Sequence, residues 1–547
     1  IDNTSTTTWN GSGWSNGLPN ANKTVIISSA ATQPFTGTPI NIAACTLIIT
    51  SATDVIIPSG FTFTVTNSVT SNGKLIFKNN SSLIQTTNAI NTGEIVYERE
   101  TNISRFDLTY WSMPVTKAGF TMSSLSPNTL YDKYFHWDAI GTRWLVDPSG
   151  VSLPMELGKG YSIRGPQSFD ITIPSLFTGI FTGVPNNGNI AVPVEADKWN
   201  LMGNPYPSAV DAEELILITN KDVLGALYFW THASPPVTLP GTNTYRYVSS
   251  DYIVFSGLGS TRLGTGSAST GTDAFNGKIA AGQAFFAKPT ASVINFNNGL
   301  RRGASDNTQF YKTAKTSGIE KNRIWLNLSN AEGAFKQTLL GYAQGATNNI
   351  DLSFDAVTMS ANTYIDFYSI SESKKLAIQA RALPFNNTDL VALGYKSTIA
   401  GEFTIAIDHT DGFFDAQEVY LEDKFTGIIT DLRKENYTFT TAVGTSTTRF
   451  VLRYTNKTLD IDNPEALENS ILVSFKDQTV KITSSKEIIK EVNIYNVGGR
   501  LLYAKNNVNA SELQITDLHS GDQVILVKVT LENGYSFTKK VIFSNLK

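Results

Sequence analysis

The segment LIITSATDVIIPSG (47–60) is followed, a short distance along the chain, by LIFKNNSSLIQTTN (75–88). In each segment, a short apolar run that begins at Leu47 or Leu75 leads into a polar corner and then a second apolar run. Runs of this length suit strands and are too short for helices. Similar runs recur throughout the first hundred residues. We therefore predict a β-solenoid-like domain over 1–100, in which each coil buries its apolar face against a neighbour. A plain β-sandwich is the alternative.

The composition of the whole chain also favours strands. Of 547 residues, 41% are hydrophobic and only 16% are charged, and Ser, Thr, Asn and Gly fill the difference. These residues favour polar turns between strands. A chain of this length exceeds one hydrophobic core, so we expect three or four domains. The net charge of -4 provides no field that would attract nucleic acid.

Residues 101–302 contain a second repeat, in which three pairs of segments correspond in order. The pairs are TYWSMPVTKA (109–118) with WNLMGNPYPSA (199–209), YFHW (134–137) with LYFW (227–230), and LGKGYSIRGP (157–166) with AGQAFFAKP (281–289). This repetition predicts an internally duplicated β domain whose halves pack together or form one large sandwich. Aromatic residues at repeated positions usually lie in the core. A platform for sugar rings, formed by Trp137 and Trp230, is the alternative.

The rest of the chain alternates between polar segments and strands. The Gly/Ser/Thr-rich stretch 256–272 predicts an exposed, mobile loop, and 303–320 predicts a linker. From 321 to 455, alternating strands with regularly spaced turns predict an antiparallel β-sandwich. An acidic hinge, 456–470, then leads into the short strands of 471–547, which predict a small Ig-like β-sandwich.

The last of these modules carries specific sequence features. They are VNIYNVGGRLLY (492–503), LHSGDQVILVKVTLENG (518–534) and TKKVIF (538–543). In these features the module resembles the C-terminal sorting domain of proteins exported by the type IX secretion system of Bacteroidetes-type bacteria. The resemblance implies that the export machinery recognises the sorting domain through Gly498, Gly499, Arg500, Gly521, Gly534, Lys539 and Lys540. Where the commonest (type A) pattern has Gly-x-Tyr, this chain has Gly-Asp-Gln at 521–523, which is closer to the type C variant.

That resemblance implies partners and a location. The partners would be the outer-membrane translocon and its shuttle β-barrel, and the protein would lie outside the cell or on its outer surface. An exposed edge strand would suit such recognition, because a partner can complete its unpaired backbone groups. Upstream, the segments 181–188, 199–212 and 381–408 look like segments of large flavobacterial surface proteins. That likeness supports a surface location.

The sequence contains few candidate catalytic or metal-binding motifs. The sequence has no nucleophile elbow, zinc motif or P-loop, and we expect no cofactor. Glu422 and Asp423 are adjacent, so on a strand they face opposite sides and cannot act as a glycosidase pair; we predict solvated edge charges. Two acidic clusters could bind calcium, although solvated loop acids are the default. The clusters are Asp408, Asp411 and Asp415, and Asp460, Asp462 and Glu465.

Taken together, these features predict a non-enzymatic secreted or cell-surface protein that acts by contact, in adhesion, gliding or a surface layer. Its partners beyond the export machinery would be glycans or other surface proteins. One alternative is a glycan-binding accessory protein in polysaccharide use, which the tryptophan-rich duplication supports. The other is an enzyme whose site is scattered across strands and therefore shows no motif.

Overall fold

The computed structural model describes residues 5–37, 40–231, 237–238, 245–246, 251–262, 275–308, 319–359, 364–456, 468–476, 479–518, 521, 523–532 and 534–543. The protein is a multidomain all-β chain, as the sequence predicts. It divides into two compact units, Ile1–Thr455 and Asn456–Lys547. Most of the predicted hinge, and with it Asp460, Asp462 and Glu465, lies outside the described residues. Within those residues, no helix combines the length and apolar character needed to cross a membrane.

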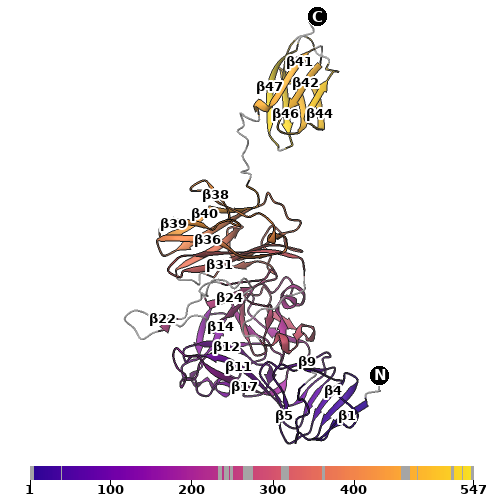
Figure 1. Cartoon of the computed structure of the whole chain (residues 1–547), viewed down its shortest axis with the longest axis vertical. Coiled ribbons are helices and arrows are strands. Elements are labelled where there is room, and N and C mark those ends of the chain that lie inside the picture. Colours follow the sequence, from indigo (N-terminus) through magenta and orange to yellow (C-terminus); the bar gives the residue numbers. More distant parts are fainter. Residues whose placement is uncertain are drawn as a thin grey trace. The chain divides into compact units, whose positions relative to one another are not determined.

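The N-terminal part is a parallel β-solenoid with three faces, coloured indigo in Figure 1. The first face stacks β1 (Ser5–Trp9), β2 (Lys23–Ile27), β4 (Thr46–Ile49), β7 (Val69–Ser71) and β10 (Thr92–Gly93); the second stacks β3 (Asn41–Ala44), β6 (Thr62–Val65) and β9 (Ser82–Gln85); the third stacks β5 (Val55–Ile57), β8 (Leu75–Phe77) and β11 (Ile95–Ile103). All of these pairs are parallel, which excludes a plain sandwich here.

The two similar segments that begin at Leu47 and Leu75 do not occupy the same place in the coils. Leu47 pairs with Val69, whereas Leu75 pairs with Val55 on another face. The segments beginning at Leu47 and Leu75 are therefore not equivalent coils. Each complete coil supplies one strand to each face, and apolar runs from different faces look alike because all of them point side chains into one core.

Two antiparallel sheets form the middle of the chain and repeat one strand order. The first runs β12 (Leu108–Ser112), β16 (Gly160–Arg164), β14 (Tyr134–Asp138) and β15 (Arg143–Val146); the second runs β19 (Asn200–Gly203), β27 (Ala284–Ala287), β21 (Leu227–Trp230), β24 (Tyr252–Phe255) and β25 (Ser260–Arg262). This is the duplication that the sequence predicts. A long strand, β17 (Ser175–Pro185), pairs with β11 and so continues the solenoid core under the first sheet.

The two sheets face each other through equivalent surfaces. Tyr110 and its counterpart Leu201 share one core, whereas the neighbouring Trp111 and Met202 point away into two other cores. Two equivalent backbone hydrogen bonds join the copies. Ser112 N donates to Gly282 O at 2.8 Å, and Gly203 N donates to Gly158 O at 3.0 Å. The halves are thus related by an approximate two-fold axis.

Shorter elements make up the rest of this part of the chain. They are β13 (Val115–Thr116), α1 (Met122–Leu125), η1 (Pro148–Gly150), β18 (Ile190–Pro193), β20 (Ala209–Asp211), α2 (Ala212–Glu214), η2 (Leu215–Thr219), β22 (Val237–Thr238), β23 (Tyr245–Arg246), β26 (Lys278–Ile279), β28 (Val293–Phe296), η4 (Asn298–Leu300), β29 (Arg301–Arg302) and η5 (Ala304–Asp306). In the predicted linker 303–320, Asn307 is buried and its Nδ2 donates to Ser81 O at 2.6 Å. Residues 309–318 lie outside the described residues.

The prediction of an exposed loop at 256–272 is wrong for the first half of this segment. Leu258 is fully buried, and the strand β25 follows it. Trp325 Nε1 donates to Ser260 O at 2.8 Å, so the next part of the chain covers this segment. Small polar residues can be buried here because their backbone groups are paired. Residues 263–272 lie outside the described residues.

The last part of the first unit is an 11-stranded sheet around a core of its own. Its strands are β30 (Lys321–Ser329), β31 (Phe335–Ala343), β32 (Ala356–Val357), β33 (Ile365–Ser371), β34 (Lys374–Ala382), β35 (Leu390–Ser397), β36 (Gly401–Asp411), β37 (Tyr420–Asp423), β38 (Ile428–Asp431), β39 (Tyr437–Thr441) and β40 (Gly444–Arg453), with η6 (Gly412–Asp415) after β36. The pairing is antiparallel except between β31 and β34, which run parallel.

The second unit is a small β-sandwich, drawn in yellow in Figure 1. A 3-stranded sheet contains β41 (Ile471–Lys476), β42 (Thr479–Ser484) and β45 (Glu512–Ile515); a 4-stranded sheet runs β44 (Leu501–Ala510), β43 (Ile489–Asn496), β46 (Gln523–Leu531) and β47 (Ser536–Phe543). Side chains such as Ile482, Val492 and Val527 are fully buried in a core of this unit's own. The segment therefore has the packing of a separate domain.

Candidate functional site

Four tryptophans of the duplicated region, Trp137, Trp144, Trp199 and Trp230, meet between the two sheets. The aromatic residues at this interface are Tyr110, Trp137, Trp144, Trp199, Tyr228, Trp230, Tyr252 and Phe286. Trp230 is only 7% exposed and packs against Tyr252 with ring centroids 5.1 Å apart. Its ring is therefore not available to a sugar. Trp137 is half-buried, and its Nε1 donates to Trp199 O at 2.6 Å. The structure thus does not present Trp137 and Trp230 as a joint platform.

Trp137 lies at the edge of a cavity of about 440 Å³, which we call the Trp137 cavity. Glu156, Glu195 and Tyr161 also line it. The Tyr161 hydroxyl accepts from Glu156 N at 2.9 Å and donates to Pro154 O at 3.2 Å, and burial raises the pKa of Tyr161 to about 12. This tyrosine is therefore engaged in holding its own wall of the cavity.

A second cavity, of about 360 Å³, opens beside Trp199 and is called the Trp199 cleft. Its lining includes Asp197, Trp199, Tyr228, Lys288, Thr290, Asp351, Asp355, Val357 and Lys374. The floor is aromatic: the rings of Trp199 and Tyr228 meet edge to face, with centroids 4.9 Å apart. The Tyr228 hydroxyl donates to Val357 O at 3.1 Å, which joins the second sheet of the duplicated region to the 11-stranded sheet that follows.

The far wall of the Trp199 cleft is held by Asp355. Its carboxylate accepts from Ala380 N at 2.8 Å and from Asp351 N at 2.7 Å. Burial nevertheless raises the pKa of Asp355 to about 7, outweighing these two hydrogen bonds, which favour the charged form. The carboxylate is thus engaged inside the protein, and it fixes the turn that follows Asp351.

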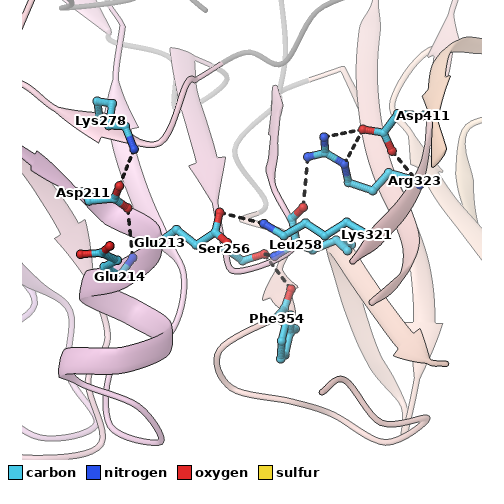
Figure 2. Close-up of polar contacts among 10 residues, drawn as sticks. All are labelled: Asp211, Glu213, Glu214, Ser256, Leu258, Lys278, Lys321, Arg323, Phe354 and Asp411. Carbon is cyan, nitrogen blue, oxygen red and sulfur yellow. Dashed lines mark hydrogen bonds and ion pairs between the residues drawn. The ribbon is translucent and has the colours of Figure 1, made fainter. Parts of the chain in front are cut away.

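A set of polar contacts joins the duplicated region to the strands after residue 320, and we call it the polar seam (Figure 2). Its members are Asp211, Glu213, Glu214, Ser256, Leu258, Lys278, Lys321, Arg323, Phe354 and Asp411. Lys321 Nζ lies 2.8 Å from Glu213 Oε2, and Ser256 Oγ donates to Phe354 O at 2.7 Å. The half-buried and buried members satisfy one another.

Asp211 is the buried centre of one end of the polar seam. It forms an ion pair with Lys278 and accepts from Glu214 N at 3.0 Å, as Figure 2 shows. Burial raises the pKa of Asp211, but these hydrogen bonds outweigh it and hold the pKa below the usual value. The carboxylate therefore stays charged and structural, at the N-terminus of the short helix α2.

The first acidic cluster that could bind calcium has protein partners for each of its carboxylates. Asp408 Oδ1 accepts from Asn327 Nδ2 at 2.8 Å, Asp411 Oδ2 accepts from Arg323 Nε at 2.9 Å, and Asp415 Oδ1 accepts from Thr410 Oγ1 at 2.8 Å. In the part of the chain that the structure describes, no three His, Cys, Asp or Glu side chains gather as metal ligands would. Each carboxylate has its own protein partner instead.

The prediction of solvated charges is wrong for Asp423. This side chain is fully buried, and its Oδ2 accepts from Arg449 Nη2 at 2.7 Å and from the Tyr437 hydroxyl at 2.7 Å. Burial raises its pKa, but the hydrogen bonds outweigh burial and hold the pKa below the usual value. Glu422, on the opposite side of the strand, lies 2.9 Å from Arg453 Nη1. The two acids do face opposite sides, as adjacent strand residues must.

The residues that the sorting-domain resemblance singles out lie in different parts of the second unit. Gly499, with φ +79°, forms the β43–β44 turn, in which Arg500 N donates to the side chain of Asn496 at 2.9 Å. The register brings this turn, which includes Gly498, to the end of the sheet where β46 begins, just after Gly521. Gly534 lies at the opposite end, in the β46–β47 hairpin.

The two lysines lie on the edge strand β47, where Lys539 pairs with Val527 and Lys540 with Leu526. Lys539 Nζ is 3.1 Å from Glu468 Oε1. Arg500 and Lys540 are both exposed. The edge strand and the glycine turn are thus separate parts of one small module.

Sequence reasoning missed the Trp199 cleft. Its walls come from segments near residues 197, 226, 288, 350 and 374, and no local pattern connects them. Trp199 itself carried a signal, because it begins one copy of the repeated segment 199–209. The lysines carried none, since exposed lysines are common on any surface.

Two family models match the chain. One, described as "Domain of unknown function (DUF8693)", matches residues 2–454, and the other, "Domain of unknown function (DUF8694)", matches residues 459–543. The chain is also 21% identical over 430 residues to the minor fimbrium subunit Mfa5 of Porphyromonas gingivalis. That match covers 76% of this chain and 33% of the relative, so the chain spans about a third of that protein's length.

Among solved structures, a polysaccharide lyase shows a faint likeness. It is 8% identical, the match covers 41% of this chain and 40% of that chain, and the TM-score is 0.12. A likeness at this level carries no argument about fold or activity.

Proposed function

This chain belongs to the family described as a domain of unknown function (DUF8693), and on that premise we propose that it is a non-enzymatic protein of the bacterial cell surface that acts by contact. The distant similarity to a fimbrium subunit supports a surface and adhesion role. Gliding and surface-layer roles belong to the same class. Contact with glycans or other surface proteins would be made by the first unit.

The same proposal includes the route of export. We infer that residues 471–547 act as a type IX sorting domain, recognised by the outer-membrane translocon and its shuttle β-barrel. The observation that best supports this role is the compactness of the second unit, which has its own core and ends in an edge strand. An export signal that is recognised after folding must be a feature of the protein surface, and a separately folded sandwich presents such a surface.

Export of a fusion protein tests the route. A periplasm-directed fluorescent protein joined to residues 456–547 should leave a type IX-competent cell and stay inside a strain that lacks the translocon. Replacing the exposed Arg500 and Lys540 together by Ala should reduce export several-fold. Lys528→Ala is the matched control, because Lys528 is an exposed lysine on the neighbouring strand β46.

The unfolding temperature of each fusion separates loss of recognition from loss of folding. Retention of the unaltered fusion in both strains would contradict the export route. Equal export of the Arg500/Lys540 variant and the control would contradict the assigned residues.

A further inference from the structure

The Trp199 cleft combines an aromatic floor with exposed charged groups. Within the described residues, Lys288, Lys374 and Asp197 form no side-chain hydrogen bond or ion pair, and all three are exposed. The charged residues of the polar seam, in contrast, form ion pairs such as Lys321 with Glu213 and Arg323 with Asp411. Unpaired charges around a concave aromatic surface are the usual makings of a binding site.

The walls of the Trp199 cleft are preformed. Trp199 is fixed by the hydrogen bond from Trp137 to its carbonyl oxygen and by edge-to-face contact with Tyr228. On the other side, Asp355 holds the turn after Asp351 through two backbone hydrogen bonds. Little conformational entropy would be lost on binding, which favours affinity.

The lining defines the chemistry of the ligand. The half-buried indole of Trp199 suits the C–H face of a sugar ring. The ammonium groups of Lys288 and Lys374 suit a carboxylate, whereas the carboxylate of Asp197 and the hydroxyl of Thr290 suit sugar hydroxyls. Asp351 and Asp355 also line the cleft, but their carboxylates accept hydrogen bonds from Thr347 N and Ala380 N. A neutral sugar would therefore bring no carboxylate to the two ammonium groups. The volume of about 360 Å³ lies at the small end of ligand pockets, which hold roughly 300–1,000 Å³, and so fits one or two rings.

We propose that the Trp199 cleft binds an acidic saccharide, with a hexuronate ring over Trp199 and its carboxylate between Lys288 and Lys374. The inference rests on the proposed contact function, because it names the ligand class through which the first unit would make contact. It does not depend on the route of export.

Binding of the purified full chain to a pair of matched oligosaccharides tests the inference. The probes are an oligogalacturonate and a galactose oligomer of the same length, titrated by calorimetry at constant ionic strength. We expect saturable binding of the acidic oligomer and at least ten-fold weaker binding of the neutral one. Lys288→Ala with Lys374→Ala should weaken binding of the acidic oligomer at least ten-fold.

The control variant replaces Lys396 and Lys424 by Ala, because both are exposed lysines outside the Trp199 cleft and their loss changes the net charge equally. The inference is overturned by no saturable binding of the acidic oligomer, by equal affinity for the neutral one, or by an equal loss in the control variant. If the purified chain binds the acidic oligomer but the fusion protein is retained inside the cell, only the export route is overturned. A surface protein that does not bind would overturn the Trp199 cleft assignment alone.

Discussion

Arg301 shows how single polar residues tie the first unit together. Its guanidinium is buried, and burial lowers the pKa of Arg301 to about 10. Nη2 donates to Leu83 O in the solenoid, and Nη1 donates to Asn187 Oδ1 at 3.0 Å in the duplicated region. The group also lies over the ring of Tyr206, 4.8 Å from its centroid. Neutral acceptors and a ring face therefore replace the carboxylate that a buried arginine usually has.

Asp355 should make the stability of the first unit depend on pH. The pKa of an Asp side chain in an unfolded chain is about 3.9, whereas the pKa of Asp355 in the folded protein is about 7. The native state therefore holds this proton more tightly. The stabilisation is fully present below about pH 4 and is lost as the pH rises through 7, by a few kcal/mol. Urea unfolding at pH 4 to 8 would measure it.

Asp355→Asn is the comparison for this prediction. The amide does not titrate, so we expect a flatter profile between pH 4 and 8. Its Nδ2 cannot accept the backbone N–H that a carboxylate oxygen accepts, so stability at pH 5 should also fall. An unchanged pH profile in the variant would show that other groups account for the dependence.

At the scale of elements, the approximate two-fold axis brings equivalent strands into close contact. Ser112 of β12 and its counterpart Gly203 of β19 meet there, and a Cβ built on Gly203 would lie 2.1 Å from the Cβ of Ser112. Only one of the two equivalent positions can therefore carry a side chain. The glycine is required by the close approach, because its own backbone conformation is ordinary.

Gly203→Ser should destabilise the first unit by about 2–3 kcal/mol, the upper part of the range of about 1–3 kcal/mol that is usual for overpacking a core. Adding Ser112→Gly should restore most of that loss, because it moves the side chain to the other copy. Chemical unfolding of both variants would measure the two effects. Gly13→Ala is the control, since no atom lies within 4 Å of the added Cβ, and a double variant no more stable than Gly203→Ser would contradict the pairing.

At this same scale, the sequence was most informative where pairing is local. The small sandwich of short strands predicted for the second unit is present, because hairpin turns and alternation mark such strands locally. The solenoid was recognisable as stacked coils, but its register was not, since parallel partners such as Leu47 and Val69 are set by stacking. The burial of Trp230 depends on a face supplied by the other copy, and the Trp199 cleft depends on five distant segments.

At the scale of the whole molecule, the two units have separate cores and should unfold separately. Calorimetry of the full chain should show two transitions. A chain ending at Thr455 should lose one of them and keep the other within about 2 °C, because each core cluster of the described residues draws its members from one unit alone. A single transition, or a large shift of the remaining one, would show that the units unfold together.

The equivalent faces of the duplicated region make its folding resemble the assembly of a dimer. In a closed pair of identical chains, the same patch on each subunit meets its copy, and each contact occurs twice. The paired bonds from Ser112 to Gly282 and from Gly203 to Gly158 have that reciprocal form within one polypeptide. Either half alone would expose its aromatic face and would need a second copy to cover it. Within one polypeptide the two faces meet on folding, so their contact does not depend on protein concentration, and each copy can carry its own residue at an equivalent position, as Ser112 and Gly203 do.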